Sequence, residues 1–394
     1  MIKKVFVLAD IGEDNNKSYH IGDEAMFLNN LRKYKSRNIE VSASSRSISH
    51  NTLGFNEVLD IYIKNVFTLF YLIICIYLLR FLKINIFPLR FQKTVSELVS
   101  SDLLHISGGG NLNSFWAGHI YYRYLMISLA TIFNKSVILT SQTIGPLTNH
   151  FHKFLLKLCL KNAKSIGVRD IDSQKELAKL GVSESKISMS IDDAQSFNVS
   201  NNKIIDRILS TNNSFFKIGV SVHQWSKFTN YKFFNNMFYK IGELDPGISF
   251  TLIPHFFDNK DGFDVNFMNN IMKGVKNNVQ FIKYQTLKQI EKETKLTFAE
   301  IIKVISSKMQ MVISSRYHGL VFALSSNIPV LAINYDNYYT MKNNAILSIY
   351  FKNLKKYSVN YNKIVLFSIL NKVKYIINNR KQISLALESK NKNL

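Results

Sequence analysis

Residues 311–334 read MVISSRYHGLVFALSSNIPVLAIN, and this stretch indicates the class of fold. Two short apolar runs, 311–313 and 330–333, have the length and the aliphatic composition of buried strands. The residues between them suffice for a helix, and Ser314 or Ser315 stands where the side chain that caps its first turn is expected. A strand, a helix and a second strand in this order predict a βαβ unit with parallel strands.

The same alternation extends along most of the chain. Further apolar runs of strand length lie at 5–8, 103–106, 137–139, 165–168, 218–222 and 248–253. Segments with helical periodicity lie between runs at 25–34, 120–133, 173–180 and 298–306. This alternation predicts an α/β protein built on parallel sheets. A polar, Asn- and Ser-rich stretch at 194–214 interrupts it, so we predict two α/β domains over 1–200 and 210–345, followed by a basic helical extension over 346–394.

The composition of the 394 residues excludes several classes of protein. With 46% hydrophobic residues the chain can form a large packed core, which excludes intrinsic disorder as its main state. Cys75 and Cys159 lie in apolar surroundings without a CxxC pattern, which excludes a disulfide scaffold and a zinc site built on cysteines. The first residues, MIKKVFVLADIG, lack the apolar length and the cleavage site of a signal peptide, so we expect a cytoplasmic protein.

The net charge is +23, from 50 Lys and Arg against 27 Asp and Glu. Such an excess attracts polyanions: nucleic acid, an anionic membrane surface or a phosphorylated substrate. Compositional drift toward Lys and Asn at surface positions would explain the same total. The distribution of the positive charge along the chain is therefore better evidence for a polyanionic partner than the total. The chain has no aromatic pattern of the RNA-binding type and no zinc-finger spacing, so we expect no specific nucleic-acid partner.

The segment 64–93 combines apolar residues with positive charge. Its run 66–79 is apolar apart from Thr68 and is 14 residues long, whereas a membrane-spanning helix needs about 20. The basic residues of the segment are Lys64, Arg80, Lys83, Arg90 and Lys93, and it contains no acid. Two interpretations are open: a helix buried in a large core, or a helix in peripheral contact with an anionic membrane.

Two further segments are basic. In 149–164, Lys153, Lys157 and Lys161 recur every four residues and so share one face of a predicted helix. We expect Phe154, Leu155 and Leu158 to point inward from the other faces. The residues 349–394 add ten basic side chains against the single acid Glu388. Each segment alone is also compatible with a solvated face.

Ligands of parallel sheets bind beyond the carboxyl ends of strands, and four such ends, after the runs 103–106, 137–139, 165–168 and 311–313, carry unusual residues. Gly108, Gly109, Gly110 and Asn111 follow the run 103–106. Three glycines permit unusual backbone conformations and the close approach of a ligand, or they form a tight turn. Neither GxGxxG nor GxxxxGK[ST] is present, so a nucleotide-phosphate loop is not indicated. Arg169 follows another run and presents a planar fork to a carboxylate or phosphate, or pairs with Asp170 at the surface.

Arg316 and His318 form the strongest candidate pair. If the chain is still extended there, residues two apart point the same way and both side chains face one site. A permanently charged guanidinium beside an imidazole that titrates near neutrality suits anion binding with proton transfer. The alternative is a histidine that only caps the following helix.

These motifs, in this order, resemble the polysaccharide pyruvyltransferase family from about residue 22 to residue 342. The matching residues are Ile21-Gly22-Asp23-Glu24-Ala25, Gly108 to Gly110, Gln142 to Pro146, Val168-Arg169-Asp170, Arg316-Tyr317-His318, Pro329, Tyr335-Asp336 and Lys342. One departure is that Tyr19-His20 stands where the family usually has Gly-Asn.

The resemblance implies a fold similar to the GT-B glycosyltransferases, with two Rossmann-like domains and a cleft between them. It implies an acceptor-side N-terminal domain and a donor-side C-terminal domain. It also implies phosphoenolpyruvate as the donor, whose pyruvate is transferred as a ketal onto two hydroxyls of a sugar. The acceptor would belong to a cell-surface polysaccharide or its lipid-linked precursor. No metal and no cofactor beyond the donor are expected.

The resemblance also suggests roles for individual residues. We expect Arg316 and Arg169 to bind the two anionic groups of the donor, and His318 to act as the acid. Further substrate contacts are expected from Ser315, Gly108, Gly109, Gly110, Asn111 and Lys342. The base for the sugar hydroxyl is unassigned, with Asp23 as a guess.

Two other functions fit parts of the sequence. A GT-B glycosyltransferase with a nucleotide-sugar donor would have a similar fold, although an Arg-x-His pair suits a small dianion better than a base and a ribose. A non-enzymatic basic protein that binds nucleic acid or membrane would explain the charge alone.

Overall fold

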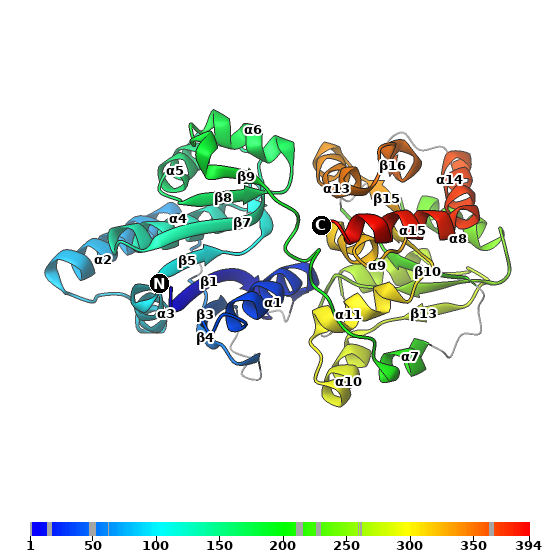
Figure 1. Ribbon diagram of the computed structural model, residues 1–394, viewed down its shortest axis with the longest axis horizontal. Coiled ribbons are helices and arrows are strands. Elements are labelled where there is room, and N and C mark those ends of the chain that lie inside the picture. The colour runs from blue at the N-terminus through cyan, green and yellow to red at the C-terminus, as the bar shows by residue number, and fades with distance from the viewer. Residues whose placement is uncertain are drawn as a thin grey trace. The chain divides into compact units, whose positions relative to one another are not determined.

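The computed structural model describes residues 2–13, 18–46, 53–61, 63–209, 216–225, 230–258, 260, 262–361 and 366–394. The chain forms two compact units: Met1–Asp14 with Asp23–Asp193 make unit 1, and Asn15–Gly22 with Ala194–Leu394 make unit 2. Figure 1 shows unit 1 in blue to green and unit 2 mainly in green to red. Residues 194–209 of the stretch expected to be a linker are part of unit 2, because Phe197 is fully buried and α7 (Lys203–Leu209) forms there; residues 210–214 lie outside the described residues.

Unit 1 is built on a parallel sheet with the strand order β4-β3-β1-β5-β7-β8-β9, and β6 pairs with β7. Its strands are β1 (Lys4–Ile11), β3 (Glu40–Ser45), β4 (Asn56–Leu59), β5 (Leu103–Ile106), β6 (Gly109–Leu112), β7 (Ser136–Ile144), β8 (Ser165–Val168) and β9 (Ile187–Met189). Its helices are α1 (Ile21–Lys35), α2 (Val66–Tyr77), α3 (Leu89–Ser100), α4 (Ala117–Ile132), α5 (His150–Leu160) and α6 (Ile171–Lys179). Consecutive residues 5–8 of β1 are all buried, so both faces of the sheet are covered.

Unit 2 is built on a second parallel sheet, in the order β13-β11-β10-β14-β15-β16. Its strands are β10 (Phe216–Ser221), β11 (Ile248–Leu252), β13 (Val279–Phe281), β14 (Met311–Ser314), β15 (Val330–Asn334) and β16 (Ser358–Asn360), with a separate antiparallel pair of β2 (Tyr19–His20) and β12 (Phe256–Phe257). Besides α7, its helices are α8 (Tyr231–Gly242), α9 (Asp264–Ile271), α10 (Tyr284–Thr294), α11 (Phe298–Ser307), α12 (Tyr317–Leu324), α13 (Asn337–Tyr350), α14 (Leu366–Asn378) and α15 (Arg380–Asn391).

The expected α/β class with two Rossmann-like halves is confirmed. Each expected strand run lies in a parallel strand or ends within one residue of it. The expected extension over 346–394 is integrated into unit 2, because β16 continues the sheet beside β15 and α14 packs against α8. Cys75 and Cys159 are buried free thiols, as expected.

Both sheets reverse their strand order once. In unit 1 the chain builds outward from β1 through β3 to one side and from β5 to the other. In unit 2 the reversal lies between β10 and β14, whose partners Ser221 and Ser314 are in register. At such a reversal the loops that follow the strands diverge, which makes the carboxyl ends of the two central strands the usual ligand-binding place.

Two expectations about helices need correction. On α5, Leu155 is buried as expected, but Phe154 and Leu158 are 54% and 43% exposed, because His152, Leu155, Leu156 and Cys159 already form the inner face. Neither Ser314 nor Ser315 caps α12, because Arg316 occupies the N-cap position and makes no side-chain capping bond.

No helix in the described part of the chain is long and apolar enough to cross a membrane.

Candidate active site

The polar residues of unit 2 converge where its sheet reverses. His223 follows β10, while Ser315 and Arg316 follow β14 directly. The backbone N–H groups of Ser315 and Arg316 donate to Ser221 O, at 3.0 and 3.4 Å, so the two strand ends are held together. The sheet therefore brings His223 and Arg316 to the same edge, although they are far apart in the sequence.

Arg316 is held by a buried carboxylate. Its Nε donates to Asp264 Oδ2 at 3.0 Å and to Oδ1 at 3.2 Å, and its Nη2 donates to Oδ1. Asp264 Oδ2 also accepts from the backbone N–H groups of His255 and Phe256, at 3.2 and 3.0 Å. Burial lowers the pKa of Arg316, but the Asp264 carboxylate outweighs this and raises it. The guanidinium is thus fixed and charged, and its Nη1 lies outside the ion pair.

His223 and Ser315 form a network behind Arg316. His223 Nδ1 lies 2.8 Å from Ser315 Oγ, and His223 Nε2 lies 2.8 Å from Tyr339 Oη. Burial lowers the pKa of His223 well below its usual range, and the charges of Arg316 and Lys342 lower it further. A neutral His223 therefore orients these two hydroxyl groups. The Ser315 hydroxyl, expected to contact substrate, is a hydrogen-bond partner of His223 in this structure.

His318 lies in the first turn of α12 rather than in an extended segment. The prediction that an extended chain places Arg316 and His318 on one face is therefore wrong, because the extended chain ends at Arg316. The His318 ring packs directly on Gly22, where an added Cβ would lie 1.8 Å from Nδ1. The glycine of the N-terminal motif is thus required for space beside the histidine of the C-terminal motif.

His255 is a residue that sequence reasoning missed. It is 5% exposed, and neither ring nitrogen has a hydrogen-bond partner in the described part of the chain. Burial lowers the pKa of His255 well below its usual range, and the charges of His318 and Arg316 lower it further, so the three groups belong to one electrostatic neighbourhood. Buried polar atoms in proteins normally have partners, which makes this imidazole a candidate ligand contact. Its only signal in the sequence is a histidine shortly after an apolar strand.

Lys342 supplies a second cation to unit 2. Its ammonium lies over the rings of Tyr317 and Tyr338, 5.5 and 5.0 Å from their centroids. Its charge acts on the pKa of His223, as does that of Arg316, so the two cations belong to one electrostatic neighbourhood. The structure therefore brings together Arg316, His318, Ser315 and Lys342 of the expected site, and adds His223, His255, Asp264 and Tyr339.

The departure Tyr19-His20 has a structural role in unit 2. β2 pairs with β12, which places the His20 ring on Phe256 with centroids 4.2 Å apart and planes 18° apart. Phe256 in turn lies under the guanidinium of Arg316, at 5.7 Å. An aromatic pair at the position of this departure thus supports Arg316.

The remaining expected residues lie in unit 1. Arg169 is buried and not a surface partner of Asp170: its Nη1 pairs with Asp192, and its Nε donates to Thr143 Oγ1 at 2.8 Å. Asp170 is instead the N-cap of α6. Asp23 is half-buried in the first turn of α1. The roles expected for Arg169 and Asp23 toward substrate stay predictions.

Gly109 and Gly110 begin the short strand β6, which Gly108 precedes, so the glycines do not form a tight turn. None of Gly108, Gly109 and Gly110 has a positive φ, so their conformational freedom is not used. Gly108 is required for space, because a Cβ would lie 2.5 Å from Met26 Sδ and 2.8 Å from Ser141 Cβ. Asn111, the last residue of the motif, donates to Asp10 Oδ2.

A polar cluster that the sequence did not reveal lies around Asp10, at the carboxyl end of β1. Arg123 Nη2 donates to Asp10 Oδ2 at 2.5 Å, and His119 Nδ1 lies 3.4 Å from Asp10 Oδ1. Burial would raise the pKa of Asp10, but the Arg123 charge holds it well below the usual range. Burial and the neighbouring Asp10 charge raise the pKa of Asp60 to about 6. Unit 1 thus has its own ionised cluster at its strand reversal.

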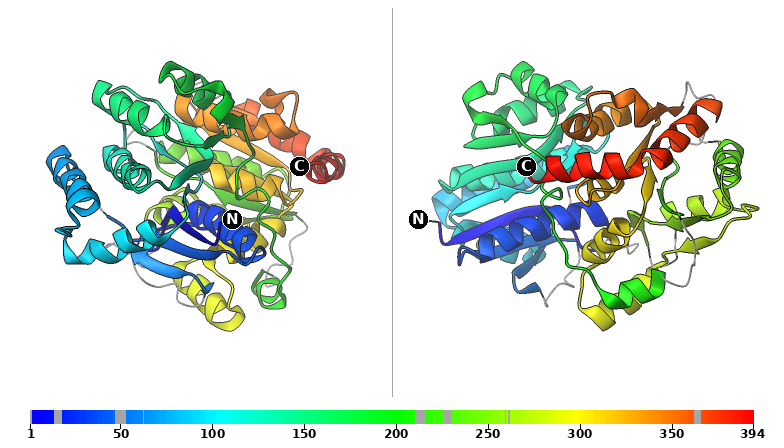
Figure 2. Two further views of the ribbon diagram at one scale, coloured as in Figure 1. Left: turned by 60° about the vertical axis from the view of Figure 1, so that its left-hand side comes forward. Right: turned by 45° about the vertical axis from the view of Figure 1, so that its right-hand side comes forward.

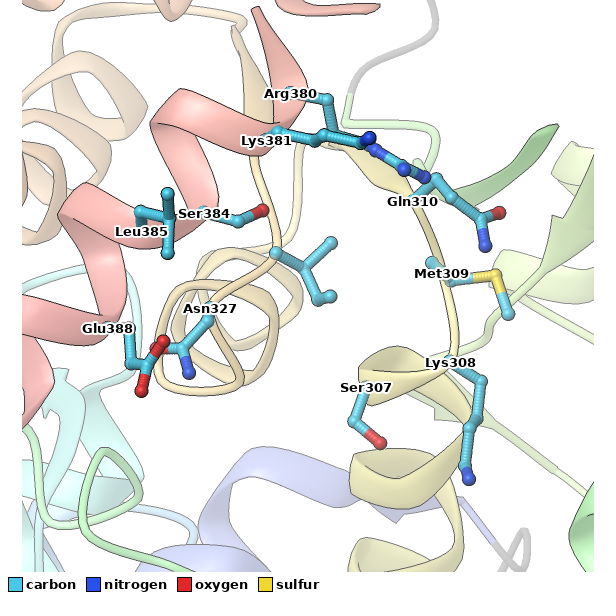
Figure 3. Close-up of a pocket in the computed structure, with 11 residues that line it drawn as sticks. Ser307, Lys308, Met309, Gln310, Asn327, Arg380, Lys381, Ser384, Leu385 and Glu388 are labelled. Atoms are coloured by element: carbon cyan, nitrogen blue, oxygen red, sulfur yellow. The ribbon is translucent and has the colours of Figure 1, made fainter.

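A groove of about 470 Å³ lies elsewhere in unit 2, between α15 and the start of β14 (Figure 3). Gln310 and Ile328 in its wall precede β14 and β15, so the groove lies at the amino ends of these strands. The polar network lies at the carboxyl ends, where ligands of such sheets bind. The groove is therefore not the candidate active site.

Comparisons with solved structures agree on the fold. HepE from Anabaena in complex with UDP-glucose has a TM-score of 0.60 at 10% identity, over 99% of this chain and 94% of that one. A putative UDP-N-acetylglucosamine 2-epimerase from Listeria monocytogenes has a TM-score of 0.60 at 11% identity, over 98% and 91%. The Neisseria meningitidis UDP-GlcNAc 2-epimerase bound to UDP-GlcNAc has a TM-score of 0.59 at 10% identity, over 98% and 94%. These likenesses show a GT-B-like fold.

A comparison with curated protein sequences finds no match. The model of the polysaccharide pyruvyl transferase family, in contrast, matches residues 8–337 and so includes all the motifs from Gly22 to Asp336. This chain, a transferase, therefore belongs to the polysaccharide pyruvyl transferase family.

Proposed function

We propose that the protein transfers the enolpyruvyl group of phosphoenolpyruvate to a sugar of a cell-surface polysaccharide, or of its lipid-linked precursor, as a pyruvate ketal. The observation that carries the proposal is the grouping of Arg316, Lys342, His318 and His255 at the strand reversal of unit 2. Two fixed cations suit a donor that carries a carboxylate and a phosphate. Family membership supports the same reaction class.

In this proposal Arg316 binds one anionic group of the donor through Nη1, because Nε and Nη2 are held by Asp264. Lys342 neutralises the other. The first turn of α12 carries no acid and has no side-chain cap, so the positive end of the helix adds to the attraction.

His318 acts as the acid that protonates the methylene carbon of the donor. The first sugar hydroxyl then adds to the adjacent carbon, phosphate leaves, and the second hydroxyl closes the ketal. Of the two protons released by the hydroxyls, one replaces the proton given by His318 and one leaves with phosphate. A positioned acid contributes roughly 100- to 10,000-fold to the rate. The bases for the hydroxyls stay unassigned.

The test compares donor binding by calorimetry in the wild type, Arg316→Lys and Lys342→Met. The control is Lys374→Met, on α14 of the same unit. Arg316→Lys keeps a charge near Asp264 but removes the planar fork, so we expect phosphoenolpyruvate binding to weaken at least tenfold. Lys342→Met should weaken it similarly, and the control should leave it unchanged.

A nucleotide-sugar donor is the second candidate, because the similar solved structures include complexes with UDP and UDP-glucose. Binding of UDP-N-acetylglucosamine without binding of phosphoenolpyruvate would overturn the first proposal and favour this one. We place the reaction in the cytoplasm, at or near the inner membrane face, where a lipid-linked acceptor would be accessible.

A further inference from the structure

Unit 1 concentrates its exposed apolar side chains in one segment. Of the 21 large apolar residues that are exposed in the described part of the chain, ten lie between residues 67 and 89. Phe67 and Leu89 are 80% and 86% exposed, and Phe70, Ile74, Phe81 and Leu82 lie between them. We call the exposed apolar residues of 67–89 the α2 surface. α2 forms the left-hand edge of unit 1 in Figure 1, and the light-blue helix projects outward in the left view of Figure 2.

Both faces of α2 are apolar. Leu69, Leu72 and Ile76 are buried on the inner face, which packs against α4. Phe67, Phe70 and Ile74 have the same three- and four-residue spacing on the outer face. A helix on the surface of a soluble domain normally carries polar residues on its outer face. The outer face of α2 is therefore built for an apolar environment.

The α2 surface is a formed structure. The Tyr71 hydroxyl donates to Ile86 O at 3.0 Å, and the Ile84 N–H donates to Leu78 O at 3.2 Å. The rings of Tyr77 and Phe81 stack with centroids 5.9 Å apart. These contacts hold the segment after α2 on the helix, so its apolar side chains and those of α2 form one surface.

Positive charge surrounds the α2 surface. Lys64 precedes α2, Lys83 follows the π-helical turn Leu78–Leu82 that continues α2, and Arg90 is the second residue of α3; all three are exposed. No acid occurs in 64–93, and none in the first turn of α2. α4 packs against both α2 and α5, and α5 exposes Phe154 and Leu158 beside its lysines. An apolar centre with a basic rim is complementary to a bilayer of anionic phospholipid.

We propose that the α2 surface docks unit 1 peripherally onto an anionic phospholipid bilayer, with its aromatic and aliphatic side chains in the interfacial region. A second copy of the chain is a poor occupant, because pairing of identical surfaces would oppose like charges in a molecule of net charge +23. This inference does not depend on the donor, since vesicle binding requires no reaction.

The test is co-flotation of the full chain with vesicles of phosphatidylglycerol and phosphatidylcholine, compared with phosphatidylcholine alone. We expect binding to the anionic vesicles that weakens with salt. Lys83→Gln with Arg90→Gln should weaken it about 30-fold. Phe67→Ser with Phe81→Ser should weaken it about 100-fold or more, because two large apolar side chains lose their apolar environment.

The matched control is Phe367→Ser with Leu385→Ser, which removes two apolar side chains of unit 2 that are 71% and 66% exposed. It should bind vesicles like the wild type. Equal binding of all variants, or equal binding to neutral vesicles and anionic ones, would overturn the proposal.

Two further measurements distinguish a bilayer from other binding partners of the α2 surface. Phe70→Trp should show an emission that shifts to the blue on vesicle binding and is quenched by lipids with brominated acyl chains. Sedimentation without lipid should show the same mass for the wild type and Phe67→Ser with Phe81→Ser. A wild-type oligomer that the double variant abolishes, without lipid quenching, would assign the α2 surface to a second copy. Tighter binding of the protein to nucleic acid than to vesicles would also overturn the proposal of a bilayer.

Discussion

Both units place an arginine–aspartate pair near the carboxyl ends of their strands, and the pairs differ in exposure. In unit 1 the side chains of Arg123 and Arg169 are 5% and 2% exposed, and both are paired with buried aspartates. In unit 2 the side chain of Arg316 is 22% exposed, although its partner Asp264 is 1% exposed. A pair in which both side chains are buried stabilises the fold, whereas a pair whose arginine is partly exposed can also bind a ligand. The predictions below test this distinction.

The largest expected effect is on the stability of unit 1. Arg169→Ala removes the guanidinium that pairs with the buried Asp192, which should cost about 3–5 kcal/mol in the free energy of unfolding. Urea unfolding followed by circular dichroism measures this. Arg316→Lys should cost less, because the partly exposed site keeps a cation. Equal losses in the free energy of unfolding for Arg169→Ala and Arg316→Lys would show that both pairs serve mainly to stabilise the fold.

The next effect is on the reaction. His318→Gln keeps the size of the side chain but cannot supply a proton, so the rate of phosphate release should fall at least 100-fold, about 3 kcal/mol. The free energy of unfolding should change by less than about 1 kcal/mol, because His318 is partly exposed. Retention of the wild-type rate would remove His318 from the mechanism.

Gly22→Ala tests the contact between the two motifs. The added methyl group would lie 1.8 Å from His318 Nδ1, so the ring must move, at a cost of about 1–3 kcal/mol in the free energy of unfolding and with a lower rate of phosphate release. Kinetics of phosphate release measures it. The control is Lys374→Met on α14, whose exposed side chain lies outside the candidate site and should leave the rate unchanged. An unchanged rate in Gly22→Ala would mean that the position of His318 is unimportant.

The smallest effect is a pH dependence in the Asp10 cluster. The pKa of Asp60 is raised from 3.8 to about 6, so the native state holds a proton that the unfolded state loses between these values. The contribution of Asp60 to stability should therefore fall as the pH rises from about 4 to about 6. Asp60→Asn should match the wild type near pH 4 and exceed it by about 1–2 kcal/mol at pH 7. Urea unfolding at both pH values tests this, and a difference that does not vary with pH would contradict it.

The amino-acid sequence was sufficient for the strands and for the ordered motifs. Runs such as 5–8 and 330–333 match β1 and β15, because strands covered on both faces are continuously apolar. The Arg-x-His motif was found because it follows such a run. The outer face of α2 was undecided, because an apolar residue looks the same in the sequence whether it is buried or exposed.

Partners distant in the sequence were decided only by the tertiary structure. Asp264 is 52 residues from Arg316, and Gly22 is far from His318, so no local spacing could pair them. Whether an arginine is sealed or open depends on which side chains cover it, and this is a property of packing. The sequence by itself determined the class of fold, the family motifs and the excess of positive charge. The folded chain decided which of the charged groups were available for chemistry, since burial and pairing set their pKa values and their access to a ligand.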